Sequence, residues 1–341
     1  MHYLVTGHTG FKGAWLSLLL QSRGHSVSGL SLDPLSGSLF EVNRLAGTFA
    51  RDARCDIRDA AATEAVIRET APDVVMHLAA QPLVRESYRE PRLTFETNVM
   101  GTYNVLEAVS RTPSVKAQLI VTTDKVYRNV DQVEGYVEDD CLGGDDPYSS
   151  SKAMADILTQ SWIASFPGVP TAIARAGNVI GGGDVSKDRL FPDLIDSFAH
   201  SRPATLRYPR AVRPWQHVLD CLDGYLAVVD ALLEGGGKGE WNFGPGAESF
   251  VPVGKVADIA ASYWGEGASW QADVGEHPHE ANLLALDATK AERELGWANR
   301  LKFPESVRWT IEWQAAVAQG REPLDVTLEQ LHAFELLRPA G

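Results

Sequence analysis

The feature that most constrains the fold is an alternation of short apolar stretches with amphipathic stretches over the first half of the chain. The apolar stretches have the length of buried strands and lie at 2–7, 25–32, 73–80, 118–123 and 171–177. The stretches with helical spacing lie at 11–24, 61–70, 94–111 and 148–166. Near-continuous apolar strands that alternate with helices predict an α/β fold with a doubly wound parallel (Rossmann) sheet. The carboxyl ends of such strands meet at one edge of the sheet.

The chain changes character after about Gly177. Loop-rich stretches with clustered Arg, Pro and aromatic residues, GGGKGEWNFGPG (235–246) among them, separate shorter helical segments. We therefore predict two domains. Residues 1–178 form a Rossmann domain with a return from about 215 to 236, and residues 179–341 form mainly a smaller, interleaved substrate-binding lobe.

A glycine-rich turn separates the first predicted strand from the first helix. Gly7, Gly10 and Gly13 have the spacing G-x-x-G-x-x-G, and glycines let the backbone approach a pyrophosphate at a helix N-terminus. A glycine turn without a ligand is the alternative. Because the turn lies between a strand and a helix, we expect a dinucleotide cofactor.

The identity of the dinucleotide depends on Asp33, which follows Gly13 by twenty residues. A carboxylate about 20 residues on hydrogen-bonds the adenosine ribose and repels a 2′-phosphate, which favours NAD over NADP. Alternatively, Asp33 only starts a turn with Pro34. The other residues expected at NAD are Thr9, Phe11, Lys12, Asp56, Ile57, Leu78, Ala79, Ala80, Gln81, Asn98, Tyr148 and Lys152.

Tyr148 and Lys152 open a predicted helix and lie on one face of it. A tyrosine needs its pKa lowered by about 3 units, or ~4 kcal/mol, to act as a base near neutral pH. A neighbouring ammonium and the positive nicotinamide favour the phenolate. The alternative is a helix-start tyrosine with a solvated lysine. With Thr123 at the end of the adjacent strand, the pair completes a Ser/Thr–Tyr–Lys set suited to proton and hydride transfer at a carbinol carbon.

An acid and an amine follow directly where the strand at 118–123 ends, in TTDKVY (122–127). Consecutive side chains of a continuing strand point to opposite faces. Asp124 and Lys125 can therefore both face Tyr148 only if the strand ends near Thr123 and the chain turns there. That is the geometry we expect.

The stretches VTGHTGFKG, HLAAQPLV, TTDKVY, PYSSSK, RAGNVIGGGD and RPWQHVLD resemble the extended short-chain dehydrogenase/reductases, and among them the CDP-glucose 4,6-dehydratases. The resemblance extends from residue 3 to about residue 300. It implies an NAD-dependent lyase that oxidises a nucleotide sugar at C4, eliminates water across C5 and C6, and gives a 4-keto-6-deoxy sugar. It also implies NAD in the first domain, the nucleotide sugar in the second, and a homodimer or homotetramer that packs through 94–111 and 148–166.

The same resemblance gives roles to Asp124, as the acid for the departing 6-hydroxyl, and to Lys125, as the C5 base. In dTDP-glucose relatives the second position is glutamate. A lysine must lose about 3 pKa units to act as a base near neutral pH. A second hypothesis is that Lys125 stays charged and stabilises the enolate.

The residues expected at the nucleotide sugar are Asn178, Arg189, Leu190, Arg207, Arg213 and His279. The resemblance implies that Asn178 binds the diphosphate, and we expect Arg213 to pair with the same diphosphate because its planar guanidinium suits phosphate. For any one arginine the alternative is a solvated surface group. The stretch HPHE (277–280) lacks a zinc-like pattern, so we expect no metal.

Composition limits the remaining functions. A formal net charge of −14 argues against nucleic-acid and anionic-membrane partners. No apolar run approaches the ~20 residues of a membrane span, and no signal-peptide pattern opens the sequence. Three separated cysteines predict no disulfide framework and favour the cytoplasm. The rival functions are a nucleotide-sugar 4-epimerase, a 4,6-dehydratase of another nucleotide sugar, and a silent NAD-binding protein.

Overall fold

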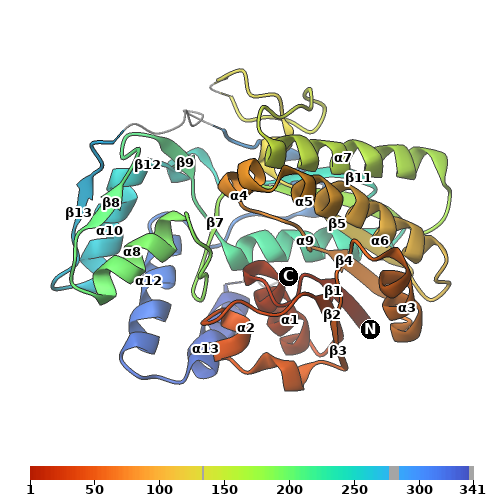
Figure 1. The fold of residues 1–341 in the computed structure, drawn as a ribbon, viewed down its shortest axis with the longest axis horizontal. Helices are drawn as coiled ribbons and strands as arrows, with labels where there is room; N and C mark the ends of the chain where they lie inside the picture. Colours follow the sequence, from red (N-terminus) through yellow and green to blue (C-terminus); the bar gives the residue numbers. More distant parts are fainter. Residues whose placement is uncertain (133, 276–283, 338–341) are drawn as a thin grey trace.

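Seven parallel strands form one sheet at the centre of the molecule, and helices cover both of its faces (Figure 1). The computed structural model describes residues 1–132, 134–275 and 284–337. Across the sheet the strands are β11 (Gly239–Phe243), β6 (Thr171–Ala176), β5 (Ala117–Val121), β4 (Val74–His77), β1 (His2–Thr6), β2 (Ser26–Ser31) and β3 (Arg51–Arg54). Every neighbouring pair is parallel. The predicted doubly wound parallel fold is confirmed.

The strand order reverses at the centre of this sheet. β1 pairs with β2 on one side and with β4 on the other, so the chain first builds outward through β3 and then in the opposite direction through β5 and β6. Open α/β sheets bind ligands outside the carboxyl ends of their strands at such a reversal. Gly7 and Leu78 follow these two strands, so the fold places the glycine turn at this point.

The two helical layers pack on alternate residues of the strands. In β1, Tyr3 and Val5 belong to the apolar cluster that includes α1 and α9, whereas Leu4 belongs to the cluster with α3 and α6. Burying a large apolar side chain contributes about 1.5–3 kcal/mol, which explains why the strands are apolar on both faces. The first layer holds α1 (Phe11–Ser22), α9 (Val218–Leu233) and α11 (Thr289–Leu295). The second holds α3 (Ala60–Thr70), α5 (Pro91–Phe95), α6 (Gly101–Ser110) and α7 (Pro147–Ser165).

Three elements of the first lobe, defined as this sheet and its helices, differ from the sequence prediction. The strand β3 was given no residue range in the sequence analysis because its sequence, RDAR, is polar. The strand β11 lies within 235–246, which we interpreted as loop because glycines surround it, although Trp241 and Phe243 are buried. The predicted helix 94–111 is α5 and α6 joined by a π-helical turn, Glu96–Met100.

The second lobe is a smaller apolar cluster built on α8 (Leu190–Ala199), α10 (Val253–Trp264) and α12 (Glu305–Ala318). Its short strands pair as β7 (Val179–Ile180) with β10 (Gln216–His217), β9 (Val212–Pro214) with β12 (Phe250–Pro252), and β8 (Ala204–Leu206) with β13 (Trp270–Ala272). The remaining helices are α2 (Leu39–Val42), α4 (Val84–Arg89) and α13 (Pro323–Leu336), with 3-10 turns at Leu45–Thr48, Asp124–Val126 and Ala247–Ser249. Among the described residues, no helix has the length and apolar character that a membrane span requires.

Candidate active site

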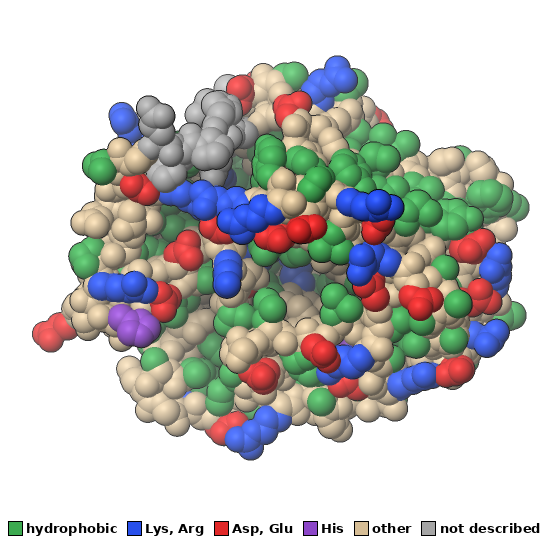
Figure 2. All heavy atoms as spheres, viewed as in Figure 1, with side chains coloured by type: hydrophobic (Ala, Val, Ile, Leu, Met, Phe, Trp, Pro, Cys, Tyr) green, Lys and Arg blue, Asp and Glu red, His purple; other side chains and the backbone are tan. Residues whose placement is uncertain are grey.

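A large cavity, of about 1540 Å³, lies along the carboxyl edge of the sheet and between the two lobes. The molecular surface is hollowed there, and Lys and Arg side chains gather along the upper edge of the hollow (Figure 2). Of the residues predicted for the cofactor and the substrate, those that line this cavity are Gly7, Thr9, Gly10, Phe11, Lys12, Gly13, Asp33, Asp56, Ile57, Leu78, Ala79, Ala80, Gln81, Tyr148, Lys152, Asn178, Arg189, Leu190, Arg207 and Arg213. Thr123, Asp124 and Lys125 line it too.

The glycine turn forms the wall of the cavity next to β1 and β4, where the strand order of the sheet reverses. Gly7 has φ +75°, and a Cβ there would lie 2.8 Å from the backbone nitrogen of Ala79. A Cβ on Gly13 would lie 2.1 Å from the carbonyl oxygen of Gly7. Gly10 precedes α1, and no side chain caps the helix. The backbone at the start of α1 is therefore open to a phosphate, which fits a dinucleotide pyrophosphate.

Two carboxylates lie where the sequence analysis expects the adenosine of NAD. Asp33 has a side chain that is 90% exposed and lies 3.4 Å from Nε of Arg54. Asp56 is paired with Arg58 at 2.6 Å, and the hydrogen bond from Arg58 holds the pKa of that carboxyl below its usual value. Asp33 is thus accessible to a ribose hydroxyl, as its sequence position predicts.

Asn98 is not among the residues that line the cavity, but it is hydrogen-bonded to Gln81, which lines it. Its Oδ1 accepts a hydrogen bond from the Gln81 backbone nitrogen at 2.8 Å, and its Nδ2 donates to the Gln81 carbonyl at 3.1 Å and to Ser151 Oγ at 2.9 Å. Asn98 therefore joins the loop after β4 to α7 without itself lining the cavity. Thr97, which precedes Asn98 in the π-helical turn Glu96–Met100, lines the cavity and was missed by the sequence analysis. The predicted His279 lies outside the described residues.

Tyr148 occupies the first turn of α7 and is buried. Its position follows from a local helix start, with Asp146 accepting from the Ser149 backbone at 3.0 Å and Pro147 at the first helical position. Burial raises the pKa of Tyr148, while the Lys125 charge and a hydrogen bond with the Thr123 side chain act to lower it.

Lys152 lies one turn further along the same face of α7. Its Nζ donates to the Val121 carbonyl at the end of β5, at 3.0 Å. Burial, with a smaller contribution from Lys12, lowers the pKa of Lys152 to about 8. The lysine therefore keeps its charge over most of the range below that pH and is fixed to the strand that carries Thr123.

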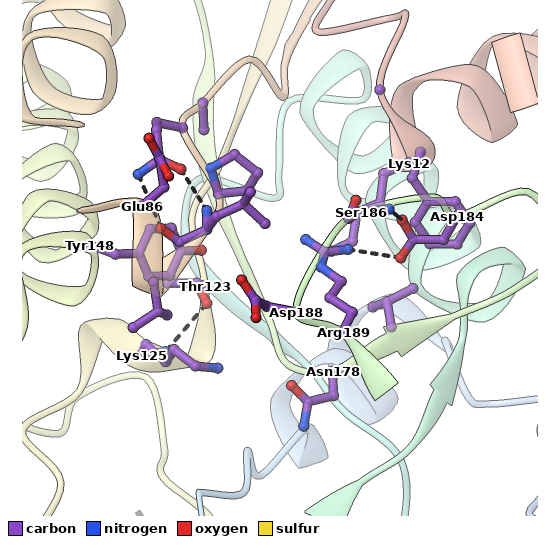
Figure 3. A pocket seen from close by; sticks show the side chains of 18 of the residues that line it. Lys12, Glu86, Thr123, Lys125, Tyr148, Asn178, Asp184, Ser186, Asp188 and Arg189 are labelled. Carbon is purple, nitrogen blue, oxygen red and sulfur yellow. Dashed lines mark hydrogen bonds and ion pairs between the residues drawn. The ribbon is translucent and has the colours of Figure 1, made fainter. Parts of the chain in front are cut away.

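The chain turns at Thr123 as the sequence analysis expected. β5 ends at Val121, and a 3-10 turn begins at Asp124. Oδ1 of Asp124 accepts from the Thr123 hydroxyl at 2.8 Å and from Lys125 Nζ at 3.1 Å. Asp124 and Lys125 thus both line the cavity, and Figure 3 shows Lys125 near Tyr148. A Cβ on Gly177 would approach Asp124 Oδ2 to 3.1 Å, so this glycine leaves room for the carboxylate.

The charge state of Lys125 bears on its two possible roles. Burial acts to lower the pKa of Lys125, but the charges of Asp124 and Tyr148 outweigh it, and the net shift is upward. A base near neutral pH needs a lowered pKa. In this arrangement Lys125 is an ammonium.

A buried polar network that the sequence analysis missed supports this end of the cavity. Asp156, one turn beyond Lys152 on α7, accepts from Thr122 Oγ1 at 2.9 Å. It also pairs with both Nε (2.9 Å) and Nη2 (2.7 Å) of Arg175 on β6, and both side chains are fully buried. Nη1 of Arg175 also donates a hydrogen bond to the Tyr127 hydroxyl at 2.7 Å. One signal was available in the sequence, because an arginine inside the apolar strand TAIARA requires a buried carboxylate.

The second lobe forms the opposite wall of the cavity. Asn178, Asp188 and Arg189 face the Tyr148 side across it (Figure 3). Arg189 is paired with Asp184 at 3.1 Å. Arg85 of α4 is paired with Asp188 at 2.9 Å, so an exposed ion pair joins the two lobes. Within the described part of the chain, no group of three His, Cys, Asp or Glu side chains is arranged to hold a metal.

Comparison with known proteins places the chain among sugar-nucleotide enzymes. The model of the NAD dependent epimerase/dehydratase family matches residues 3–244. The CDP-glucose 4,6-dehydratase of Salmonella typhimurium is 44% identical over 331 residues, covering 94% of this chain and 92% of that protein. The dTDP-glucose 4,6-dehydratase of Mycolicibacterium smegmatis is 30% identical over 334 residues, covering 96% and 98%.

Solved structures show the same fold. The dTDP-glucose 4,6-dehydratase of Streptomyces venezuelae, crystallised with NAD, has a TM-score of 0.81 at 24% identity, covering 95% of this chain and 100% of that one. The UDP-glucose 4-epimerase of Thermus thermophilus with NAD has a TM-score of 0.81 at 24% identity, covering 94% and 99%.

The Asp156–Arg175 pair makes a testable contribution to stability. Replacing Asp156 with Asn leaves the guanidinium buried without its charge partner, which costs about 3 kcal/mol or more. We expect the midpoint of thermal unfolding to fall by about 5 °C or more. The matched control is Glu329→Gln, which removes an exposed pair with Arg321 and should shift the midpoint by less than ~2 °C. Equal shifts in the two variants would contradict the supporting role of the buried pair.

Proposed function

The chain belongs to the NAD dependent epimerase/dehydratase family, and from that membership we propose that it is an NAD-dependent 4,6-dehydratase that converts CDP-glucose to CDP-4-keto-6-deoxyglucose and water. The resemblance seen in the sequence is confirmed. One observation carries the dehydratase assignment, namely that Asp124 and Lys125 line the same cavity as Tyr148. The similarity to a CDP-glucose 4,6-dehydratase over 94% of the chain supports the choice of CDP-glucose.

The first lobe is suited to hold NAD. The Gly7–Gly13 turn has the close backbone approach that a pyrophosphate needs, and Asp33 offers an exposed carboxylate to the ribose. When bound, NAD serves as a two-electron acceptor at C4 and later as a donor at C6, so no oxidant is consumed. We assign the nucleotide sugar to the second-lobe wall, with Arg213 and Asn178 at its diphosphate.

The protein's own groups supply the proton transfers. Tyr148 takes the proton of the C4 hydroxyl, and the Thr123 side chain, its hydrogen-bond partner, orients it. The resulting C4 ketone acidifies the C5 proton. That proton passes through water to the Asp124 carboxylate, which gives it to the departing C6 hydroxyl, and the hydroxyl is released as water. Lys152, one helical turn beyond Tyr148 and hydrogen-bonded to Val121, keeps its charge below its pKa of about 8.

Of the two roles considered for Lys125, the structure favours that of an electrostatic stabiliser. Its pKa is raised, chiefly because the Asp124 and Tyr148 charges overcome burial, and an ammonium has no lone pair to accept the C5 proton. We propose that the ammonium stabilises the enolate oxygen at C4 while the proton passes to water. The same charge lowers the pKa of Tyr148.

Two substitutions of Lys125 separate these roles. Arginine keeps the charge but is too weak a base to accept the proton, whereas methionine removes the charge. We expect Lys125→Arg to retain solvent-deuterium exchange at C5 and Lys125→Met to lose at least tenfold in turnover. Because the charge lowers the pKa of Tyr148, the rising limb of the pH–rate profile should move to higher pH in Lys125→Met and stay in place in Lys125→Arg. Loss of C5 exchange in both variants, with ketone still formed, would restore lysine as the base.

The proposed reaction is tested by incubating the protein and NAD with CDP-, UDP-, dTDP- and GDP-glucose. We expect CDP-glucose to give a 4-keto-6-deoxy product, detected by its absorbance in alkali and by mass loss of one water. Tyr148→Phe is the control and should give none. A C4 epimer without loss of water would show a 4-epimerase, and no product from any of the four sugars would reject the enzymatic function.

We also propose that the protein forms a homodimer through the outer face of α6 and α7. Met154 and Ile157 of α7 are 48% and 52% exposed, and Met100, in the π-helical turn that packs on α7, is 51% exposed. Such exposed apolar side chains favour burial against a second copy.

Light scattering should show a dimer that becomes monomeric in Ile157→Glu. Leu328→Glu, at a similarly exposed position on α13, should leave it intact, and an unchanged mass in Ile157→Glu would contradict this interface.

A further inference from the structure

The first turn of α7 leaves the backbone N–H of Tyr148 to be satisfied from outside the helix. The first N–H groups of an α-helix have no partner within it. In α7 the first residue, Pro147, carries no N–H. The N–H groups of Ser149 and Ser150 are accepted by the Asp146 side chain at 3.0 Å and by its carbonyl at 2.8 Å. Neither the helix nor its cap therefore supplies an acceptor for the N–H of Tyr148.

Ser87 of α4 supplies that acceptor. Its Oγ accepts a hydrogen bond from the Tyr148 backbone nitrogen at 3.1 Å, and Ser87 is fully buried. The hydroxyl hydrogen of Ser87 is directed elsewhere, because it donates to the Val84 carbonyl at 2.6 Å. An oxygen lone pair is thus left for Tyr148. Since the bond lies in the interior, a substitution that removes the hydroxyl leaves the N–H of Tyr148 without an acceptor.

Helix α4 is itself fixed to the first lobe. Gln81, in the loop before it, accepts from the Leu83 backbone nitrogen through Oε1 at 2.6 Å and donates through Nε2 to Thr94 Oγ1 of α5 at 2.9 Å. The helix packs on both α5 and α7 (Figure 1). Ser87 faces α7 and is not among the residues that line the cavity. It can therefore act on the reaction only through the residue that it holds.

The reach of Tyr148 towards a substrate depends on this contact. A side chain that takes a proton must lie within hydrogen-bond distance of it, and the backbone at the start of α7 sets where the phenol lies. Lys152 and Asp156 attach α7 to the sheet one and two turns further along, whereas Ser87 holds the turn that carries the phenol. We propose that Ser87 is a positioning residue for the oxidation at C4, an inference that rests on the proposed function. A misplacement of about 1 Å can lower a rate about 100-fold.

Ser87→Ala tests the proposal in a reaction that stops after its first step. CDP-6-deoxyglucose has no C6 hydroxyl to lose, so the hydride that leaves C4 stays on the nicotinamide, whose reduced form is detected by its absorbance. With the full chain and saturating NAD, we expect the rate of reduction to fall at least tenfold in Ser87→Ala and the final absorbance to stay that of the wild type. The KM for CDP-glucose should change little, because Ser87 does not line the cavity. Ser87→Cys, whose sulfur accepts only weakly, should show a smaller decrease in rate.

The matched control is Ser306→Ala. Ser306 is likewise fully buried in the first turn of a helix, α12, and its Oγ donates to the Leu301 carbonyl at 3.2 Å. This variant should reduce the nicotinamide at the wild-type rate, and the thermal midpoints show that all three variants are folded.

Two results overturn the inference. One is a wild-type rate in Ser87→Ala, including a smaller final absorbance reached at that rate, which would show only a loss of folded protein. The other is an equal decrease in rate in Ser306→Ala. A wild-type protein that reduces no nicotinamide and makes no ketone from any nucleotide sugar overturns the proposed function instead, so the two failures are distinguishable.

Discussion

The attachment of helix α7 to the ends of β5 and β6 is the interaction on which the active site depends. Tyr148, Lys152 and Asp156 follow one another at intervals of four residues and so share one face of the helix. Lys152 donates a hydrogen bond to the Val121 carbonyl. Asp156 accepts a hydrogen bond from Thr122 and forms an ion pair with Arg175. Because the Asp156–Arg175 pair is wholly buried, a shift of α7 by one turn would leave a charge unpaired in the core, at a cost of several kcal/mol. Tyr148 is thereby held over the turn that starts at Thr123.

The same attachment sets the electrostatics of the site. Burial alone raises the pKa of Tyr148 and lowers that of Lys152, which opposes the ionised form of each group. The nearby ammonium of Lys125 counteracts burial at Tyr148, and the adjacent Asp124 keeps Lys125 charged. The phenol of Tyr148 must lose its proton, and the ammonium of Lys125 must keep its proton. Each of these two groups therefore stabilises the ionised form of the other. This explains how an acid–amine pair can occupy the end of a buried strand.

Features carried by contiguous sequence could be predicted. The glycine turn, the alternation of strands and helices, and the Tyr148–Lys152 spacing depend on neighbours along the chain, and the structure has them where the patterns place them. Features that depend on distant partners could not. Asp156 and Arg175 are 19 residues apart and become a pair only when α7 packs on β6. Asn98, which we predicted at the cofactor, makes its hydrogen bonds to Gln81 and Ser151, which are 17 and 53 residues away along the chain. The edge strand β3 gives no apolar signal because none of its residues is buried.

The central claim is that α7 and the turn after β5 bring Tyr148, Asp124 and Lys125 to one sugar. The most direct measurement is a crystal structure of the inactive Tyr148→Phe variant with NAD and CDP-glucose. The account predicts that the glucose ring lies between residue 148 and the turn, with the Asp124 carboxyl at the C6 hydroxyl and Lys125 Nζ at the C4 oxygen. A glucose ring outside this space, or Lys125 turned away from it into solvent, would contradict the account.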